Sequence, residues 1–528
     1  MIARTLMIQG TSSSVGKSLL VAALCRIFAR RGVRVAPFKA QNMSNNAAVC
    51  ADGSEIGRSQ QLQAAAAGID PTADMNPILL TPEADARSQV IVDGRPWRTQ
   101  EARAYFGSRQ ELWPIVVAAL ERLRQAYELV ILEGAGSPAE CNLRAVEIVN
   151  MAVARHAGSP VVLVGDIERG GVFAQLLGTL WLLSDLDRAL VRGLIVNKFR
   201  GDASLFDGGV TFLEERGGVP VLGVVPWLPR LDLPEEDAVA LDGAHAEEPA
   251  AKTGLDITVI RLPRIANFDD FDPLAAEPGT RVRYVDAPNR LGQPSAIILP
   301  GTKSTMDDLH WLREVGLAEA IVEFARRGVP VVGICGGYQM LGQVIRDPRR
   351  IESSWAETAG LGLLPTETVF APAKQTNQVR AIVRDDRHCP GSGGRAVEGY
   401  EIHLGQTTGA EPWLRISHRG GVVVEAADGA ISEDGRIWGC YLHGLFANDL
   451  FRRAWLDSLG GRKGDTAAFP IGQATSSGRT STAARLEQSL NRLADCVENA
   501  LDMKKLERIA WNSTGKGQSN ARRREHRP

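Results

Sequence analysis

A cysteine flanked by glycines, in the segment VVGICGGYQMLGQ, has the sequence surroundings of a nucleophile. The apolar run before Cys335 predicts a buried strand and the segment after it predicts a helix, so the thiol falls at a strand-to-helix turn of the form G-x-C-x-G. Gly333 and Gly337 permit a strained turn, and the start of a helix favours the thiolate. Free cysteines are usually buried packing groups, so the assignment of Cys335 as a nucleophile requires partners elsewhere in the chain.

Acyl transfer at a cysteine requires hydrogen-bond donors for the oxyanion and a base for the thiol. The backbone N–H of Gly336 is one natural donor, and the loop LPGTKST offers Gly301 as the second. His443, which ends the apolar segment of GCYLHGLF, is the predicted base. His403, in GYEIHLG, occupies a similar position and is the alternative. This combination predicts an acyl-transfer site with Cys335 as the attacking group.

A second chemical motif, GTSSSVGKS, follows an apolar strand pattern near the N-terminus and opens a helical segment. Small residues let the backbone curl with its N–H groups inward, and the helix N-terminus adds partial positive charge, so the layout favours a phosphate. The motif has one residue more than the usual P-loop between its first glycine and GKS. The residues predicted to bind the nucleotide are Gly10, Thr11, Val15, Gly16, Lys17 and Ser18 in this loop, and Asn197 at the end of a later strand.

A nucleotide site of this kind uses Mg²⁺, which takes oxygen ligands. The Ser18 hydroxyl is one predicted ligand. Glu133, in ELVILEGAGSPAE, is the best carboxylate candidate because it falls at the carboxyl end of a buried strand, where ligands of open α/β sheets collect. Glu55 and Asp52, in CADGSEIGRSQ, are weaker candidates, and spacing does not choose between them.

Both motifs need strand-to-helix junctions, and the chain supplies them in two sets. Short runs rich in Val, Ile and Leu alternate with amphipathic stretches, which predicts α/β domains with parallel sheets. The expected organisation is a P-loop domain at residues 1–232, a linker at 233–254 and a second α/β domain at 255–460. A C-terminal polar segment, 461–528, is expected to contain one helix and a basic disordered tail.

Composition limits the classes of partner. The 528 residues include 60 Lys and Arg against 62 Asp and Glu, a formal net charge of −2, which argues against a protein-wide nucleic-acid or membrane-binding surface. The seven cysteines form no C-x-x-C pair, as expected for reduced thiols. The N-terminus does not read as a signal peptide and no apolar run reaches the roughly 20 residues that span a bilayer, so a cytoplasmic location is expected.

Several of these segments resemble known families. GICGGYQMLG with YLHGLF resembles the class I glutamine amidotransferase domain of the cobalamin-biosynthesis type, and GTSSSVGKS with LEGAGSPAE resembles the ATP-binding domain of the dethiobiotin synthetase superfamily. Their order in one chain, together with PFKAQNMSNNA, EIGRSQQLQAAAAG, RLPRIANFDDFDPL, LPGTKSTMDDLHWLR and EGYEIHLG, resembles the cobyric acid synthase family over roughly residues 4–460 and the late helix.

This resemblance implies ATP- and glutamine-dependent amidation of the b, d, e and g carboxylates of adenosylcobyrinic acid a,c-diamide, which yields adenosylcobyric acid. Cys335 would attack the glutamine carboxamide, and His443 would pass a proton to the departing ammonia. ATP would phosphorylate each carboxylate, and ammonia would displace the phosphate. The implied partners are thus the small molecules corrinoid, glutamine and ATP, with Mg²⁺ as cofactor and without nucleic acid or membrane.

Two points of the resemblance concern particular residues. In many class I amidotransferases a glutamate two positions after the histidine orients it, but here that position is Leu445; either a Cys-His dyad operates, as in similar cobalamin-type domains, or another acid such as Glu401 serves. The loop KAQNMSNNA offers Lys39, Asn42 and Asn45 as contacts to carboxylates and amides of the corrinoid, the alternative being an Asn-rich turn.

Three rival functions stay open at the level of sequence. Cobyrinic acid a,c-diamide synthase performs the same chemistry on other carboxylates, although EGAGSPAECNL resembles the cobyric acid enzyme more. A P-loop switch ATPase usually has a second lysine early in its loop, where this chain has Thr11, Ser12 and Ser13. An amidotransferase domain kept only as a scaffold is disfavoured because its nucleophile, base and donor glycines are all present.

Overall fold

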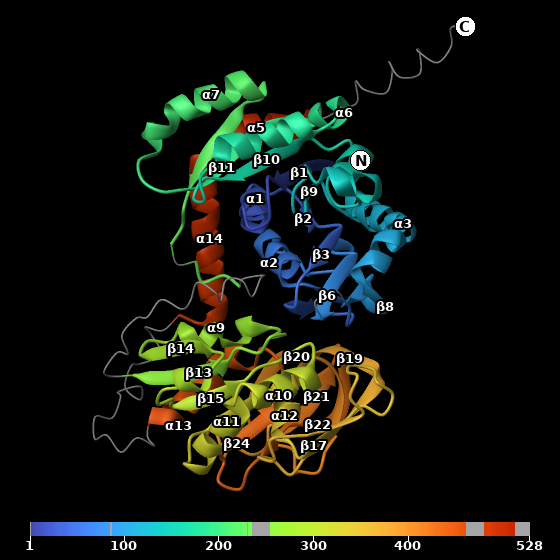
Figure 1. Ribbon diagram of the computed structural model, residues 1–528. Helices are drawn as coiled ribbons and strands as arrows, with labels where there is room; N and C mark the ends of the chain where they lie inside the picture. Colours follow the sequence, from blue (N-terminus) through green and yellow to red (C-terminus); the bar gives the residue numbers. More distant parts are fainter. Residues whose placement is uncertain (1, 85–86, 230, 235–253, 461–479, 513–528) are drawn as a thin grey trace.

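The computed structural model describes residues 2–84, 87–229, 231–234, 254–460 and 480–512. It has two α/β lobes stacked one above the other, the N-terminal lobe at the top of Figure 1. The two parallel-sheet domains expected from the sequence are confirmed. Within the described ranges, no helix is both long enough and apolar enough to cross a membrane.

The N-terminal domain is built on a six-stranded parallel sheet with the order β12-β11-β10-β1-β9-β2. Its strands are β1 (Arg4–Gly10), β2 (Val35–Phe38), β9 (Leu129–Glu133), β10 (Val161–Asp166), β11 (Val191–Phe199) and β12 (Val221–Pro226). The helices of this domain are α1 (Lys17–Arg30), α2 (Arg58–Ala67), α3 (Ala102–Ala126), α4 (Met151–Ala157), α5 (Val172–Leu182), α6 (Asp185–Arg188) and α7 (Asp207–Gly217).

Both faces of this sheet are buried, which explains its nearly continuous apolar strands. Alternate strand residues point to opposite faces: Leu6 and Ile8 pack with α1, whereas Met7 packs in the core that contains α3 and α5. The sheet is therefore the middle layer of a three-layer domain, and the carboxyl ends of its strands form the edge at which the P-loop begins.

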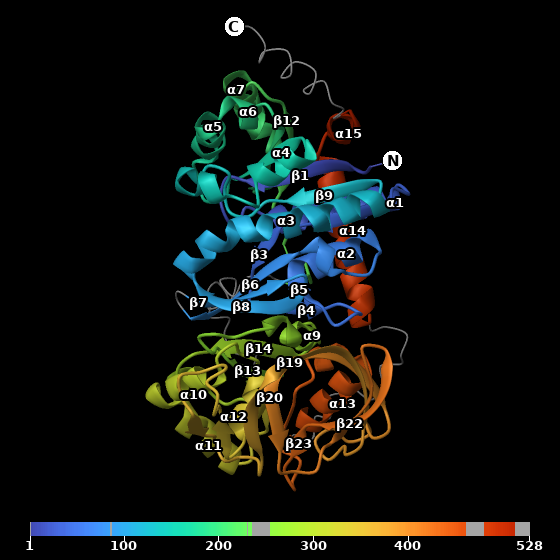
Figure 2. The ribbon, with the colours of Figure 1, turned by 90° about the vertical axis from the view of Figure 1, so that its right-hand side faces the viewer.

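A smaller set of strands lies between this sheet and the C-terminal lobe (Figure 2). It consists of the sheet β3-β6-β7-β8 and the hairpin β4-β5, neither of which the sequence predicted. Their bounds are β3 (Gln41–Met43), β4 (Ala47–Val49), β5 (Glu55–Gly57), β6 (Ile78–Ala84), β7 (Arg87–Val92) and β8 (Arg95–Glu101). These strands bring the N-terminal domain into contact with the other lobe, where Ala47, Leu79 and Ile91 pack with Tyr400 and Ile402.

The C-terminal domain has a second sheet with the order β14-β13-β15-β16-β24-β23, parallel except at the short edge strand β23. Its strands are β13 (Leu255–Ile260), β14 (Thr280–Val285), β15 (Ala296–Leu299), β16 (Val331–Ile334), β23 (Ala430–Ile431) and β24 (Ile437–Cys440). The helices are α9 (Asp272–Ala275), α10 (Thr305–Glu314), α11 (Leu317–Arg326), α12 (Gly336–Leu341) and α13 (Asp449–Gly460).

A largely antiparallel sheet completes this domain. It contains β17 (Val344–Arg346), β18 (Glu357–Ala359), β19 (Glu367–Val383), β20 (Ala396–Thr408), β21 (Leu414–Arg419) and β22 (Val422–Asp428). The apolar segment GVVVEAA lies in β22, which pairs antiparallel with β21. Its alternating exposure is typical of a strand with one solvated face.

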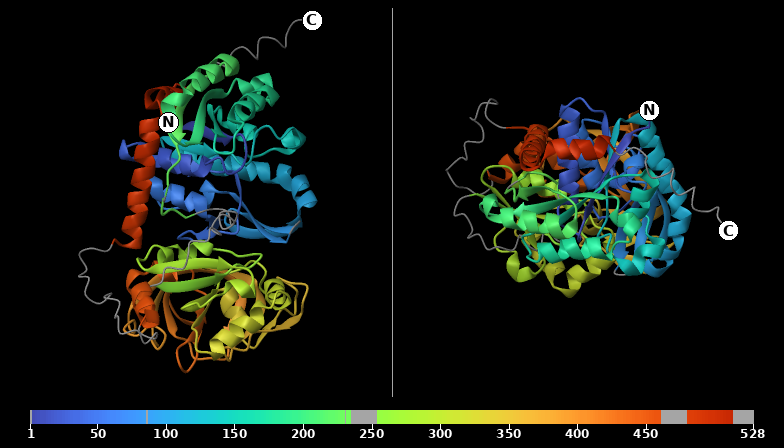
Figure 3. Two further views of the ribbon diagram at one scale, coloured as in Figure 1. Left: turned by 60° about the vertical axis from the view of Figure 1, so that its left-hand side comes forward. Right: turned by 90° about the horizontal axis from the view of Figure 1, so that it is seen from above.

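The prediction of one helix in the C-terminal segment is wrong, because residues 480–512, the part of it that the structure describes, form two: α14 (Thr482–Ala500) and α15 (Met503–Trp511). The chain breaks at Leu501, which bridges to Gly223 of β12, and Asp502 caps α15 by accepting the N–H of Lys505. Leu493 and Val497 of α14 are buried in the core of the N-terminal domain, and Figure 3 shows α14 running along that domain. The predicted linker at 233–254 and basic tail lie almost wholly outside the described residues.

Candidate active sites

Cys335 stands at the junction of β16 and α12 in a strained backbone conformation. Its φ and ψ are 51° and −110°, a backbone conformation that residues other than glycine rarely adopt. A Cβ on Gly337 would lie 1.9 Å from the carbonyl oxygen of Leu299, so this position of the elbow admits only glycine without a shift of the backbone. The thiol is 7% exposed, and its Sγ is 3.5 Å from the carbonyl oxygen of Ile402. This geometry matches the turn that the G-x-C-x-G spacing predicted.

His443 follows β24, lines the same pocket as Cys335 and is hydrogen-bonded to an acid. Its Nδ1 lies 2.7 Å from Oδ2 of Asp270, whose Oδ1 accepts the N–H of Gly444 at 2.8 Å. Burial alone would lower the pKa of His443, but the charge and hydrogen bond of Asp270, with smaller effects of Cys335, raise it to about 10. The arrangement is therefore a Cys-His-Asp triad that keeps the imidazole protonated.

Sequence reasoning missed Asp270. The segment NFDDFDPL contains three aspartates at 269, 270 and 272, and only the packing of the 3₁₀ helix η4 (Phe268–Phe271) against the loop after β24 selects one of them. The proposed alternative, Glu401, faces elsewhere: its carboxylate pairs with Arg419 at 2.8 Å and accepts the amide of Asn377 at 2.7 Å. Glu401 is thus not the residue that orients His443.

The rival histidine, His403, lines the same pocket but is held away from the triad. Its Nδ1 is 2.8 Å from the carbonyl oxygen of Gly405, and its ring stacks on Tyr441 with centroids 3.8 Å apart. The Nδ1 of His443, by contrast, is hydrogen-bonded to the carboxylate of Asp270.

The two predicted oxyanion glycines adjoin the nucleophile. The Gly337 N–H donates to the carbonyl oxygen of Pro300, which ties the loop after β15 to the start of α12. A Cβ on Gly301 would lie 2.9 Å from Cε1 of His443, and one on Gly336 would lie 2.8 Å from Cγ2 of Thr302. Both glycines line one pocket with Cys335 and His443.

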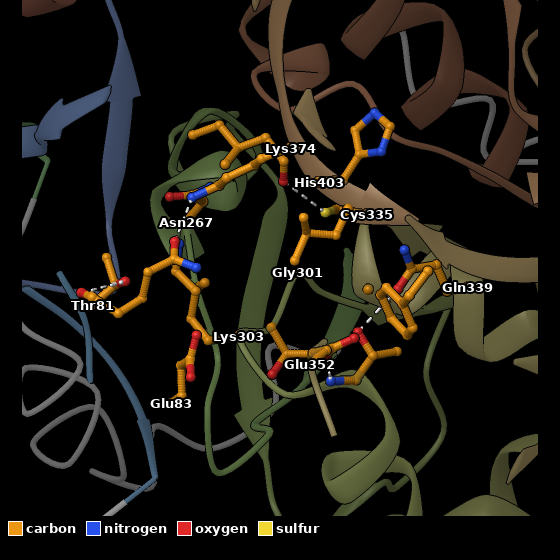
Figure 4. Close-up of a pocket in the computed structure, with 18 of the residues that line it drawn as sticks. Thr81, Glu83, Asn267, Gly301, Lys303, Cys335, Gln339, Glu352, Lys374 and His403 are labelled. Carbon is orange, nitrogen blue, oxygen red and sulfur yellow. Dashed lines mark hydrogen bonds between the residues drawn. The ribbon is translucent and has the colours of Figure 1, made fainter. Parts of the chain in front are cut away.

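That pocket extends across the domain interface, as Figure 4 shows. The C-terminal domain contributes Lys303, Gln339, Glu352 and Lys374, and the N-terminal domain contributes Thr81, Glu83 and Gln89 from β6 and β7. Cys335 therefore shares its pocket with residues of the N-terminal domain.

Glu55 does not fit a metal site. Its carboxylate lies at the domain interface, 2.6 Å from Nζ of Lys374 and 3.9 Å from Nζ of Lys303. Burial raises the pKa of Glu55, but the two lysine charges outweigh burial and lower it. Because both lysines come from the other domain, sequence spacing gave no sign of this pairing. The equally weak candidate Asp52 accepts hydrogen bonds from Ser54 in a local turn.

The P-loop joins β1 to α1 as predicted. Gly16 has a φ of 95° and precedes the helix, and Lys17 folds over the loop, its Nζ donating to the carbonyl oxygens of Ser12 at 2.9 Å and Gly136 at 3.2 Å. A Cβ on Gly10 would lie 2.5 Å from Cγ2 of Val15, so the loop curls tightly over its first glycine. Thr11 donates its hydroxyl to Gln175 on α5. The ammonium of Lys17 is thus beside the cradle of backbone N–H groups.

Asn197 contacts this loop from the end of β11. Its Nδ2 donates to the carbonyl oxygen of Val15 at 2.8 Å, and a Cβ on Gly16 would lie 2.3 Å from the same nitrogen. Lys198 donates to the carbonyl oxygen of Ser14 and pairs with Asp166 at 2.9 Å. Both residues therefore support the backbone of the phosphate loop.

Ser18 and Glu133 form the strongest candidate for a cation site. Ser18 Oγ donates to Glu133 Oε1 at 2.7 Å, so a hydroxyl and a carboxylate face the same point beside the phosphate loop. Oxygen donors of this kind suit Mg²⁺, which also takes phosphate oxygens and water. Clusters of three or more His, Cys, Asp or Glu side chains that could bind a metal without a nucleotide are absent from the described residues.

The residues proposed to contact the corrinoid are only partly brought together. Lys39 pairs with Glu133 Oε1 at 2.9 Å, so it lies at the nucleotide site. Asn42 donates its amide to Gln60 Oε1 at 3.0 Å. Oδ1 of Asn45 is buried and lacks a hydrogen-bond partner among the described residues, which leaves an acceptor available to a ligand.

The fold and the two sites define the class of the protein: a class I glutamine amidotransferase domain joined in one chain to a P-loop nucleotide-binding domain. Residues 256–451 match the family described as CobB/CobQ-like glutamine amidotransferase domain, and residues 6–239 match the CobQ/CobB/MinD/ParA nucleotide binding domain.

The comparison with individual proteins is more specific. The chain is 56% identical to the cobyric acid synthase of Chloroflexus aurantiacus, over 96% of this chain and 99% of that protein. It is 50% identical to the cobyric acid synthase of Sorangium cellulosum, again over 96% and 99% of the two chains. The chain belongs to the cobyric acid synthase family and is a glutamine-hydrolysing amide synthase of cobalamin biosynthesis.

Proposed function

We propose that this protein amidates the b, d, e and g carboxylates of adenosylcobyrinic acid a,c-diamide, with ammonia from glutamine and activation by ATP. The observation that carries the proposal is the pocket at Cys335, which is lined from both domains and so joins the release of ammonia to the domain that consumes it. Family membership supports the choice of corrinoid.

In the C-terminal domain, Cys335 Sγ, its proton transferred to His443, forms a bond to the carboxamide carbon of glutamine, and the carbonyl electrons move onto oxygen. The N–H groups of Gly336 and Gly301 stabilise this oxyanion. His443, held in one tautomer by Asp270, gives its Nε2 proton to the departing ammonia. Water then hydrolyses the thioester to glutamate and restores the thiol.

In the N-terminal domain, the carboxylate of the corrinoid attacks the γ-phosphorus of ATP, and ADP leaves. Lys17 and the N–H groups of the P-loop hold the β- and γ-phosphates. Mg²⁺, held by Ser18 and Glu133, would neutralise phosphate charge. Ammonia then displaces phosphate from the acyl phosphate to give the amide, which a free carboxylate cannot form because it has no adequate leaving group.

Recognition of the corrinoid is assigned to Lys39, Asn42 and Asn45. Lys39 can interact with a substrate carboxylate near the γ-phosphate, because its ammonium already lies beside Glu133. Asn45 offers an unsatisfied acceptor to the N–H groups of an amide.

The test is to incubate the purified protein with ATP, Mg²⁺ and glutamine, and to offer either cobyrinic acid or its a,c-diamide. Successive conversion of four carboxylates to amides in the a,c-diamide, followed by mass spectrometry, is the expected result. Amidation of the a and c carboxylates of cobyrinic acid instead would assign the protein to the sister reaction. Nucleotide hydrolysis without any amidated product would favour a P-loop switch.

A further inference from the structure

The N-terminal domain contributes an arginine to the surroundings of His443. Arg58 is the first residue of α2, and its Nε lies 2.9 Å from Oδ2 of Asp269 in the other domain. Its guanidinium also donates to the hydroxyl of Tyr400. The side chains of Arg58 and Asp269 are 10% and 9% exposed, so this ion pair is buried at the domain interface.

The two partners of Arg58 flank the triad. Asp269 directly precedes Asp270 in η4. The ring of Tyr400 stacks on the imidazole of His443, with centroids 5.2 Å apart and an interplanar angle of 17°. The backbones of Tyr400 and His443 also exchange two hydrogen bonds, of 2.9 and 3.1 Å. Arg58 thus contacts both Asp269, which is adjacent to the triad acid, and Tyr400, whose ring packs on His443.

Charge explains why an arginine is needed here. Asp269 and Asp270 are adjacent buried carboxylates, and like charges at this distance repel. Burial raises the pKa of Asp269, and Arg58 is the strongest influence that opposes this rise. Without Arg58, Asp269 would take up a proton or move toward water, and either change would shift Asp270 relative to His443 Nδ1.

A second contact from the N-terminal domain fixes the loop before η4. The N–H of Ala47 donates to Oδ1 of Asn267 at 2.9 Å. Asn267 has a φ of 52°, and its Nδ2 lies 3.5 Å from Nε2 of His443. Both connections therefore reach residues in contact with the triad.

The position of Arg58 is set by the nucleotide site, because α2 contacts both that site and the C-terminal domain. Gln63 lies about a turn and a half after Arg58 on α2. Its Nε2 donates to Oε2 of Glu133 and to the carbonyl oxygen of Ser18. The carboxylate that receives the Ser18 hydroxyl thus also anchors the helix that presents Arg58 to the other domain.

We infer that Arg58 is a positioning residue for glutamine hydrolysis, supplied by the nucleotide-binding domain, and that the Cys335–His443 site is complete only while the two domains are docked through α2. Arg58 does not line the Cys335 pocket, so it acts through Asp269 and Tyr400. The inference rests on the proposed function for the roles of Cys335 and His443.

The test compares Arg58→Ala and Arg58→Lys with the unchanged full-length protein, measuring glutamate formation at several glutamine concentrations. A misplaced base lowers turnover by about 10- to 100-fold, so Arg58→Ala should lower kcat by that factor and leave KM within about threefold. Arg58→Lys keeps a cation beside Asp269 and should recover most of kcat. Synthesis from ammonia, ATP and the a,c-diamide should stay within about threefold in both variants.

Gln378→Ala is the matched control, because it removes another hydrogen bond across the interface, from Gln378 Nε2 to the carbonyl oxygen of Val49. Its glutaminase kcat should be unchanged. An unchanged kcat in Arg58→Ala, an equal loss of ammonia-dependent synthesis, or a lysine variant no better than alanine would overturn the inference. Failure of the unchanged protein to release glutamate or form amides would instead refute the proposed function.

Discussion

Replacing Asp270 by asparagine removes the charge beside His443 and keeps a side chain of the same size. Burial lowers the pKa of His443, and Asp270 is the main reason that it nevertheless rises from 6.5 to about 10. Without that charge the pKa should fall to 6.5 or below. The lost stabilisation of the imidazolium is then on the order of 5 kcal/mol, at about 1.4 kcal/mol for each pKa unit.

Two consequences follow for catalysis. The asparagine amide can donate to Nδ1 and stabilise the wrong tautomer, a change that costs about 10⁴-fold in serine-protease triads; we expect a loss in kcat of about 10²- to 10⁴-fold. The pH dependence should also change. Because the folded-state pKa of His443 is raised, both the general acid and its contribution to stability are fully present below pH 6.5 and are lost as the pH rises through about 10.

The assay is glutamate release measured from pH 6.5 to about 10. The unchanged protein should keep its activity until the alkaline end of this range, whereas Asp270→Asn should lose its residual activity near neutral pH. Glu401→Gln is the control, since Glu401 pairs with Arg419 and should leave the alkaline limb in place. An alkaline limb at the same pH in Asp270→Asn and the unchanged protein would refute the role of Asp270.

Four further predictions test the remaining assignments. Cys335→Ser should abolish glutamine-dependent synthesis and spare ammonia-dependent synthesis, and Lys17→Ala should abolish both; equal loss of both in the cysteine variant would contradict two separate sites. Glu133→Gln should lower ATP-dependent synthesis by about 10²-fold or more, and the response of that synthesis to Mg²⁺ concentration should shift, because the carboxylate charge is lost. Gly337→Ala should yield no active glutaminase, since the added Cβ lies 1.9 Å from Leu299 O, while nucleotide binding measured by calorimetry persists. Leu493→Ala should destabilise the N-terminal domain by about 2–4 kcal/mol in denaturant titrations, because Leu493 is 3% exposed in its core, whereas Leu205→Ala, at an 84% exposed site, should change little.

Much of the fold and of both sites could be predicted from local sequence signals. The apolar runs that became β1 and β16 are each followed by a glycine-containing turn and then a helix, α1 after the phosphate loop and α12 directly after Cys335. Two glycines are also required by local backbone geometry. Gly16 adopts a φ of 95°, and a Cβ on Gly337 would lie 1.9 Å from the carbonyl oxygen of Leu299 in β15. These patterns were sufficient to locate the phosphate loop and the nucleophile elbow.

Other features depended on contacts between distant segments. Glu55 was considered for Mg²⁺, but two lysines of the other domain take its carboxylate. The late helix was expected to be single, but its pairing with β12 at Leu501 breaks it into two. The strands β3 to β8 were not predicted because β3, β4 and β5 have only three residues each, and β6, β7 and β8 carry polar residues that interrupt their apolar runs.

The sequence alone thus determined which residues can do chemistry, because a thiol in an elbow and a lysine after a glycine loop are set by neighbours a few positions away. Tertiary structure alone decided the partners: that Asp270 rather than Asp269 or Glu401 orients His443, and that Arg58 of the other domain lies behind it. The physical reason is how far apart in the sequence the interacting residues lie. Backbone conformation is governed by adjacent residues, whereas ion pairs and pKa values depend on which buried groups the packing of remote segments brings within a few ångströms.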